Sequence, residues 1–551
     1  MRSKTFGLTC LCSAAVLTFS FTQAGQAQPS APAAVAELDP STLAGQDVRV
    51  TTITGAVWPG HLAEVTADGL TVQGSAGPYT ISRAAVRTVE PLRPLPRLRP
   101  VMAVSQAALV EGGELRIHGS NTVGAQMVPN LLEAYGQATG RSKIQVTPGK
   151  SDEERMIGLG GGGKNRDINV DLQSHGTGTA FVSLVTKAAD LGMASRPVND
   201  KEREAVMAAG LGDLRSVGQE HVVGLDGLSV IVNRDNRVTT LSLTQMAAIF
   251  SGTVVDWSEV GGSPGRIQVY TLDMKSGTFD TFNELVMHRR PMAPGARNLE
   301  SSTKLSDDVA ADPNGIGFIG LAYVRSARAV AVAQGCGLTT PAEPFMVRTE
   351  EYPLSRRLFL YNPAEPTQPV VNFLNFASST KAQPAIAAAG FVTLAPELST
   401  TSYSELRKRN APEMFATPGT VMDPKQSQPI VQGLRALFSE SQRLSITFRF
   451  QPDSAALDTR GEADIERLVA WSKEPANASR QFVLVGYGSS IGSFAQNVAL
   501  SRTRADALAQ RLQATGLRSV TAIGAGPVGA VACNADAHGQ ALNRRVEVWV
   551  K

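Results

Sequence analysis

Short alternating segments open the first part of the chain. Between residues 43 and 90, apolar and polar residues alternate in runs such as 48–51, 70–72 and 79–81, and glycines separate the runs. Alternation with a period of two is typical of half-exposed strands, and the glycines mark turns between them. The pattern predicts a small all-β domain, an antiparallel meander that closes into a small barrel.

A different pattern runs from residue 113 to residue 400. Apolar runs such as Leu115–Ile117, Ile168–Leu172 and Leu228–Val232 predict strands, and stretches with helical spacing follow several of them. In the first such stretch, Val123, Met127, Leu131 and Leu132 recur on one helical face. Strands that alternate with helices predict an α/β domain, with ligand-binding turns at the carboxyl ends of the strands.

The last segment, residues 436–551, mixes the two patterns. Strands are expected at 444–450, 482–485, 520–524 and 546–550, and helices at 463–472 and 497–514. The expected architecture is a two-layer α+β sandwich.

The segments between these domains have the composition of leaders and linkers. Residues 1–27 combine a basic start, an apolar run and Gly25-Gln26-Ala27, which indicates a secretory signal peptide rather than a membrane anchor. Residues 28–42 are expected to form a flexible leader, residues 91–112 a Pro-rich linker and residues 401–435 a second linker. A chain of 551 residues is long enough for several domains.

The net charge and the histidine and cysteine content limit which ligands and which disulfide the protein is expected to have. The net charge of +3 is small and scattered, which argues against nucleic-acid binding. With 6 histidines and no ligand spacing, neither a metal site nor a cofactor is expected. After signal cleavage only Cys336 and Cys533 remain, and an interdomain disulfide and two free thiols are both open.

Four turns of the central segment share small hydroxyl residues. They are GSNT at 119–122, SHGTGT at 174–179, ASR at 194–196 and KSGT at 275–278. The first-turn N–H groups of a helix lack backbone partners, so such turns can donate hydrogen bonds to a small oxyanion. Ser120 or Thr122 could equally serve only as a helix cap. The glycine run at 158–164 imitates a phosphate-binding loop but is followed by Asn165, and we interpret it as a plain loop.

The central segment resembles the phosphate-binding substrate proteins of ABC importers, which have a two-lobed periplasmic binding (type II) fold. The resemblance lies in IHGSNTV, ADLGMASRPVNDKE, GLDGLSVIVNRDNRV, IFSGTVVDWSEVGG, KSGTFDTF and GIGFIGLAYV, in the order of the family. It implies phosphate, or a related oxyanion, held between two lobes. By position, the implied ligand-binding residues are Ser120, Asn121, Thr122, Ser174, Gly176, Thr177, Ser195, Arg196, Ser276, Gly277 and Thr278.

One position departs from that family. An arginine is expected four residues before the serine of the SGT turn, and this chain has Leu272 there. Loss of a bidentate cationic donor weakens an anion site or changes its ligand. Arg196 and Lys275 are the candidates to replace it.

The C-terminal segment resembles the OmpA-like peptidoglycan-binding domain. The matching stretches are FRFQPDSAALD, GYGSSIG, NVALSRTRA and NRRVEVWV. The resemblance implies that Arg504 contacts the carboxylate of diaminopimelate in the wall peptide. The family's aspartate is replaced by Ser489, which supplies no anion for the ligand's ammonium. Asn497 and Arg545 are further candidate contacts, although Arg545 could instead be an exposed charge at a strand end.

Together these features predict a non-enzymatic binding protein of a Gram-negative periplasm, associated with the cell wall or outer membrane. It would capture phosphate or a similar oxyanion, attach to peptidoglycan and contact another envelope protein through the N-terminal barrel. Leu272 and Ser489 leave an alternative, an envelope scaffold with degenerate ligand sites. A phosphatase that uses an activated serine, with His175 as its base, is a third hypothesis.

Overall fold

The computed structural model describes residues 40–52, 57–74, 77–91, 113–151, 153–161, 167–274, 276–400, 424–450 and 456–551. The predicted signal peptide, most of the leader and of both linkers, Lys275 and part of the glycine run at 158–164 lie outside these residues. Within the described ranges, no helix combines the length and the apolar composition needed to cross a membrane.

The N-terminal segment is an open antiparallel sheet. Its order is β4-β3-β2-β1-β5, and no pairing among the described residues joins the two end strands, so the expected closed barrel is not observed. Val48, Val50, Leu62, Leu70 and Val72 are buried and form a small core together. The strands are β1 (Asp47–Thr52), β2 (Val57–Val65), β3 (Gly69–Gly74), β4 (Gly77–Ser82) and β5 (Val86–Pro91).

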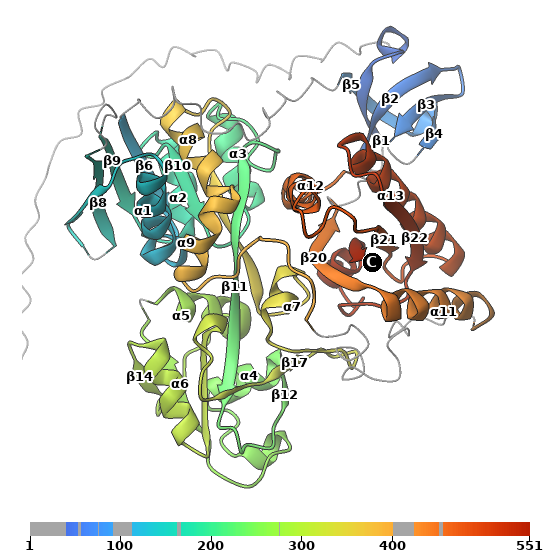
Figure 1. Cartoon of the computed structure of the whole chain (residues 1–551). Helices are drawn as coiled ribbons and strands as arrows, with labels where there is room; N and C mark the ends of the chain where they lie inside the picture. The colour runs from blue at the N-terminus through green and yellow to red at the C-terminus, as the bar shows by residue number, and fades with distance from the viewer. Residues whose placement is uncertain are drawn as a thin grey trace, which may run out of the picture.

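The central segment is built on one long mixed sheet that passes through two lobes (Figure 1). Its order is β14-β13-β15-β11-β19-β10-β6-β9-β8-β7, and β16 (Arg328–Ala329) pairs with β11 outside this path. The first-lobe strands are β6 (Gly113–Gly119), β7 (Lys143–Pro148), β8 (Glu154–Gly160), β9 (Ile168–Gln173) and β10 (Leu191–Ala194). The second-lobe strands of this sheet are β13 (Gln268–Leu272), β14 (Arg297–Leu299) and β15 (Gly315–Gly320).

Two long antiparallel strands, β11 (Glu220–Val232) and β19 (Ser355–Tyr361), form the hinge that joins the lobes. Figure 1 shows β11 running from the upper lobe into the lower one. A small second-lobe sheet contains β12 (Thr240–Ser242), β17 (Ala331–Ala333) and β18 (Thr339–Thr340). The helices are α1 (Val128–Ala138), α2 (Thr177–Val185), α3 (Asp200–Ala208), α4 (Leu243–Phe250), α5 (Gly277–Phe282), α6 (Ser302–Ala311), α7 (Pro344–Arg348), α8 (Gln368–Ala377) and α9 (Gln383–Ala388).

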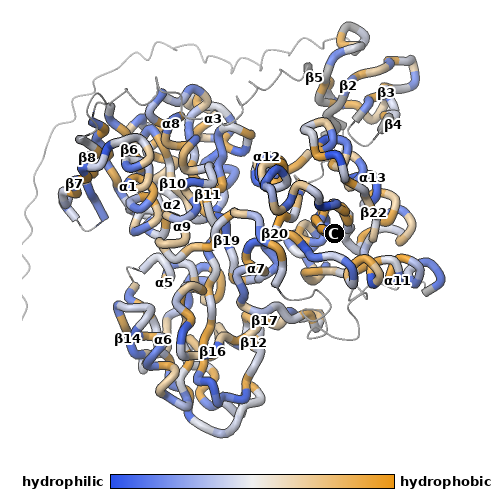
Figure 2. Tube along the Cα trace, in the orientation of Figure 1, coloured by the Kyte–Doolittle hydropathy of each residue, from blue (hydrophilic) through white to orange (hydrophobic). Residues whose placement is uncertain are grey.

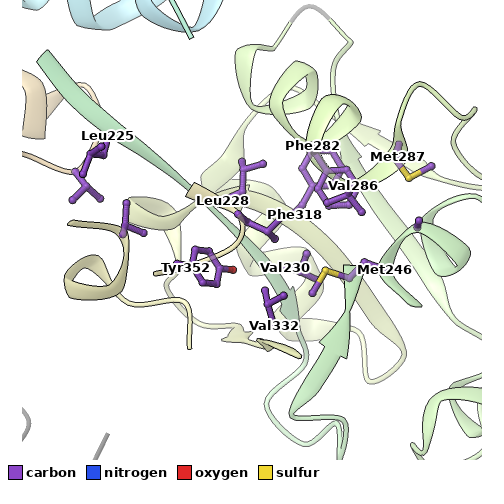
Figure 3. Close-up of a cluster of buried hydrophobic side chains, with 14 of the residues drawn as sticks. Leu225, Leu228, Val230, Met246, Phe282, Val286, Met287, Phe318, Val332 and Tyr352 are labelled. Carbon is purple, nitrogen blue, oxygen red and sulfur yellow. The ribbon is translucent and has the colours of Figure 1, made fainter. Parts of the chain in front are cut away.

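The largest core cluster anchors the second-lobe helix α5 on the sheet. Phe282, at the end of α5, stacks on Phe318 of β15 with ring centroids 3.9 Å apart, and Phe250 of α4 meets both rings edge-on. Figure 3 shows Phe282 and Phe318 packed together near Leu228 of the hinge strand. This aromatic packing holds the end of α5 against the sheet, and the helix begins at the SGT turn.

The C-terminal segment is a four-stranded sheet, ordered β20-β23-β21-β22, with helices on both faces. Its strands are β20 (Gln442–Arg449), β21 (Phe482–Tyr487), β22 (Val520–Gly526) and β23 (Arg545–Val550). Its helices are α11 (Pro424–Glu440), α12 (Thr459–Ser472), α13 (Phe494–Ala514) and α14 (Ala537–Asn543).

Helix α11 changes the expected two-layer sandwich into three layers. Leu434, Leu437 and Phe438 pack against the sheet face opposite α12 and α13, and Phe438 stacks on Trp549 at 4.1 Å. In Figure 2, α11 alternates between hydrophilic and hydrophobic positions, as an amphipathic helix does. Residues 424–435, expected to be a linker, therefore belong to this helix.

A disulfide joins the central and C-terminal segments. Cys336, between β17 and β18, is bonded to Cys533, and their Cα atoms are 5.8 Å apart. Of the two arrangements that the sequence left open, the structure contains the interdomain bridge.

Candidate functional site

Two predicted turns of the first lobe lie side by side. The Gly176 N–H donates to the Gly119 carbonyl at 2.8 Å, which joins the SHGTGT turn to the GSNT turn. Gly176 has φ of 97°, a conformation that favours glycine, and it immediately precedes α2. The start of α2 has no side-chain cap, and the Thr179 N–H of its first turn donates to the Gly176 carbonyl at 3.0 Å, so the N–H groups of Thr177 and Gly178 are the candidate donors to an anion.

The third turn, ASR, is joined to the start of α2. The Thr177 hydroxyl lies 3.2 Å from the Ser195 hydroxyl and accepts from the Ser195 N–H at 3.1 Å. Three of the four predicted turns thus form one continuous polar surface at the carboxyl ends of β6, β9 and β10. This is the arrangement expected for a ligand site in an α/β fold.

The fourth turn meets this surface from the second lobe. The Thr122 hydroxyl donates to the Gly277 carbonyl at 3.3 Å, although the two residues are 155 positions apart. A Cβ atom at Gly277 would lie 2.7 Å from the Thr122 Cα, so the close approach of the lobes requires glycine there. The two lobes are therefore in direct contact at the predicted site.

The sequence did not predict the cation that lies at this contact, Arg356 of β19. Its Nη2 donates to the Thr122 hydroxyl at 2.8 Å and to the Gly277 carbonyl at 3.4 Å, and it also contacts the Thr281 hydroxyl. Its side chain is only 9% exposed. Arg356 thus touches one predicted turn from each lobe, and the hinge strand carries it there.

Of the two residues expected to compensate for Leu272, Lys275 lies outside the described residues, and Arg196 pairs with a carboxylate. Leu272 is 1% exposed and packs in an apolar cluster, so it contributes no donor. The Arg196 guanidinium is held by the Glu202 carboxylate through bonds of 2.8 and 2.7 Å, and this pairing raises its pKa. Arg356, rather than Arg196, is the arginine that contacts both the GSNT turn and the SGT turn.

Carboxylates surround Arg356 and balance its charge. Asp226 of β11 is buried and accepts from Arg356 Nε at 3.2 Å, and the Glu284 carboxylate lies 3.8 Å from Nη1. Burial raises the pKa of Asp280 on α5, and Arg356 opposes that shift. An anion that enters must therefore compete with these carboxylates for the guanidinium.

The remaining predicted residues mainly shape the turns. Ser276 caps α5 by accepting from the Thr278 N–H at 3.2 Å. Ser120 and Ser174 are buried, and the Ser174 hydroxyl lies against Gly124, where it would be 2.1 Å from an added Cβ. His175, considered as a catalytic base, instead lies 3.2 Å from Glu154 Oε1.

The C-terminal segment contains a second candidate, Arg504 on α13. Its guanidinium stacks over Phe450 at 5.2 Å, and its Nε is buried without a hydrogen-bond partner among the described residues. Burial lowers the pKa of Arg504 to about 10, and Arg544 adds to that shift. A buried cation with an unused donor attracts an anionic group.

The other predicted wall contacts are less accessible. Asn497 lies two helical turns before Arg504 on α13, but its amide donates to the Ile491 and Ser493 carbonyls. Ser489 is buried. Arg545 is 0% exposed and donates to the Glu547 carboxylate at 2.6 Å, so it is not an exposed charge at a strand end, and its role as a wall contact stays a prediction. A buried arginine needs such a partner, and the sheet supplies it two residues later.

Among the described residues, no three His, Cys, Asp or Glu side chains gather as a metal ion would require.

Comparison with known proteins identifies two parts of the chain. Residues 111–393 match the model of the PBP superfamily domain, and residues 449–544 match that of the OmpA family. Protein SphX of Synechococcus elongatus is 28% identical over 266 residues, which span 46% of this chain and 77% of that protein.

Two further relatives carry phosphate in their names. The phosphate-binding protein PstS of Pseudomonas aeruginosa is 26% identical over 262 residues, with 44% of this chain and 79% of that protein covered. A crystal structure of an ABC-type phosphate transport receptor from Vibrio cholerae covers 51% of this chain and 99% of its own, at 23% identity and a TM-score of 0.38. The match to the PBP superfamily model extends over more than half of the residues, and the chain belongs to that superfamily, with an OmpA-like segment following it.

Proposed function

We propose that this protein binds phosphate or a closely similar oxyanion between the two lobes of its central segment. The observation that carries the proposal is the convergence of hydroxyl-bearing turns from both lobes on Arg356. Backbone N–H groups at helix starts, hydroxyls and a guanidinium are the donors that oxyanions accept from. The names of the relatives SphX and PstS agree with this ligand class only in part, because PstS alone is named for phosphate.

Arg356 supplies the arginine whose absence at position 272 argued against a phosphate ligand. The loss of an arginine at Leu272 suggested a degenerate site, but Arg356 brings a charged fork to the same turns from the hinge strand. Such a fork can donate two parallel hydrogen bonds to an oxyanion. We infer a binding protein rather than a phosphatase, because His175 pairs with Glu154 instead of a serine of the turns.

Calorimetric titration of the mature chain, stripped of bound anion, tests this ligand class. We expect binding of phosphate and of arsenate, which has the same shape and protonation, at micromolar concentrations or below. No heat and no thermal shift with phosphate, arsenate or sulfate would remove the oxyanion proposal and favour the envelope scaffold.

We further propose that the C-terminal segment attaches the protein to peptidoglycan in the periplasm. Support comes from the OmpA family match and from the unpaired Nε of Arg504, which suits a carboxylate of the wall peptide. Purified sacculi should retain the wild-type protein in a pull-down. Absence of retention for the wild type would end this part of the proposal, and the role of the N-terminal sheet as a contact for another envelope protein would need its own test.

A further inference from the structure

The C-terminal segment docks on the hinge through one buried carboxylate. Glu350, between α7 and β19, accepts from Arg357 Nη2 at 2.8 Å and from Arg449 Nε at 3.0 Å, and it lies 3.0 Å from Arg460 Nη1. Arg357 belongs to the hinge strand, whereas Arg449 and Arg460 come from β20 and α12 of the C-terminal segment. Buried ions persist only when they are paired, so neither side of this cluster is complete without the other.

Further contacts extend the docking to both lobes. Asp458, at the start of α12, lies 2.7 Å from Arg357, and the next residue, Thr459, donates to Glu220 at the first-lobe end of β11. On the second lobe, Gln334 accepts from the Cys533 N–H at 3.0 Å beside the Cys336–Cys533 disulfide. The C-terminal segment therefore spans the hinge and contacts a lobe on each side. Figure 1 shows α12 and β20 beside the middle of the central segment.

The two arginines of the hinge strand connect this interface to the turns where the lobes meet. Successive residues of a strand point to opposite sides. Arg356 accordingly contacts the GSNT and SGT turns, while Arg357 contacts Glu350 and Asp458. A shift of β19 that broke the Arg357 pairs would also move Arg356 away from Thr122.

We propose that the C-terminal segment is a positioning part of the oxyanion receptor, which holds β19 so that Arg356 contacts the turns of both lobes. Asp458, Glu350 and Arg357 are then positioning residues, and docking of this segment and binding of the anion stabilise each other. For its ligand readout, this inference rests on the proposed oxyanion function.

Asp458→Asn is the sharpest test, since asparagine caps a helix as well as aspartate does but cannot form the ion pair with Arg357. Asp536→Asn is the matched control, because Asp536 caps α14 in the same way and, among the described residues, forms no ion pair with the central segment. In the full mature chain, we expect Asp458→Asn to weaken phosphate binding about five-fold or more, within the usual range of coupling between sites. The control should bind as the wild type does. Both variants lose one negative charge, which by itself would favour an anion.

Hydrogen exchange of the unliganded chain gives a second readout that needs no ligand. Asp458→Asn should speed the exchange of backbone amides in β11 and β19, and Asp536→Asn should not. Unchanged exchange in these strands would overturn the inference, as would equal phosphate affinity in the two variants and the wild type. If the wild type bound no phosphate, the proposed function would fail. The exchange comparison would still decide whether the C-terminal segment stabilises the hinge strands.

Discussion

At the scale of single residues, the site depends on close approach and on one cation from a distant strand. The turns were predictable because helix starts rich in Gly, Ser and Thr have a local signature. Arg356 was not predictable, because the residues next to an arginine within a strand do not show whether it binds a ligand. Its partners Thr122 and Asp226 lie 234 and 130 positions away. The burial of Arg545, which the alternative of an exposed strand-end charge did not foresee, has the same cause, since it depends on the sheet around it.

Gly277 should be the glycine on which lobe contact depends most. In Gly277→Ala, the new Cβ would lie 2.7 Å from the Thr122 Cα, so the lobes must separate. We expect phosphate affinity to fall at least about ten-fold, or about 1.4 kcal/mol. Gly295→Ala is the control, because an added Cβ there meets nothing within 4 Å. Equal affinities of the two variants would show that lobe contact at Gly277 does not matter to binding.

Arg504 should destabilise the folded state and be necessary for attachment to peptidoglycan. Its pKa is lowered in the folded state, so its charged form destabilises the fold at every pH below about 10, and the cost disappears only as the pH rises from there toward the unfolded value. Arg504→Gln should therefore leave the unfolding free energy unchanged or raise it by about 1 kcal/mol. The same variant should lose retention on sacculi.

Arg502→Gln serves as its control, because Arg502 lies on the same helix in an exposed pair with Asp506. Denaturant unfolding and the sacculus pull-down measure both effects. A strongly destabilised Arg504→Gln, or full retention of that variant, would contradict this account.

At the scale of elements, the alternation of strands and helices in the central segment was predicted from periodicity, and the two-lobed fold from the family motifs. Helix α11 was missed because Pro429 and the polar residues around it are typical of a linker. Its apolar residues Ile430, Leu434, Leu437 and Phe438 nevertheless recur at helical spacing, and that signal was available in the sequence. Closure of the N-terminal sheet could not be predicted, because it depends on pairing between strands that are not neighbours in the sequence.

Helix α11 should be an integral part of the C-terminal fold. Phe438→Ala removes a buried ring that stacks on Trp549, and we expect it to lower the unfolding free energy of this segment by about 3 kcal/mol. Gln432→Ala, at an exposed position of the same helix, should change it by less than about 0.5 kcal/mol. Tryptophan fluorescence during denaturation would follow both variants, and similar midpoints for the two would show that α11 is dispensable.

At the scale of the whole molecule, a disulfide and a buried ion cluster turn two segments into one unit. Burial by itself would raise the pKa of Glu350, but Arg357, Arg460 and Arg449 outweigh it and hold the pKa well below its usual range. A carboxyl group with a lowered pKa stabilises the folded state above its unfolded pKa, and this stability is lost as the pH falls toward the folded value. The interface should therefore persist in mild acid.

Comparison of the wild type with Glu350→Gln isolates that contribution. At neutral pH we expect the variant to be less stable by about 3 kcal/mol, because three arginines lose a charged partner. The difference should stay constant down to about pH 5 and shrink below about pH 4, the usual range of a glutamate. A difference that already disappeared near pH 6 would contradict the lowered pKa.

We propose that Arg356 supplies the charged fork of an oxyanion site between the lobes. The most direct measurement is calorimetric titration of Arg356→Lys with phosphate. Arg203→Lys is the control, because Arg203, on α3 of the first lobe, forms an ion pair with Asp213 through two hydrogen bonds. Lysine keeps the charge but loses the fork. We predict that Arg356→Lys binds phosphate at least about ten-fold more weakly, or about 1.4 kcal/mol, while Arg203→Lys matches the wild type. Phosphate affinity that is the same in Arg356→Lys and the wild type would contradict the claim.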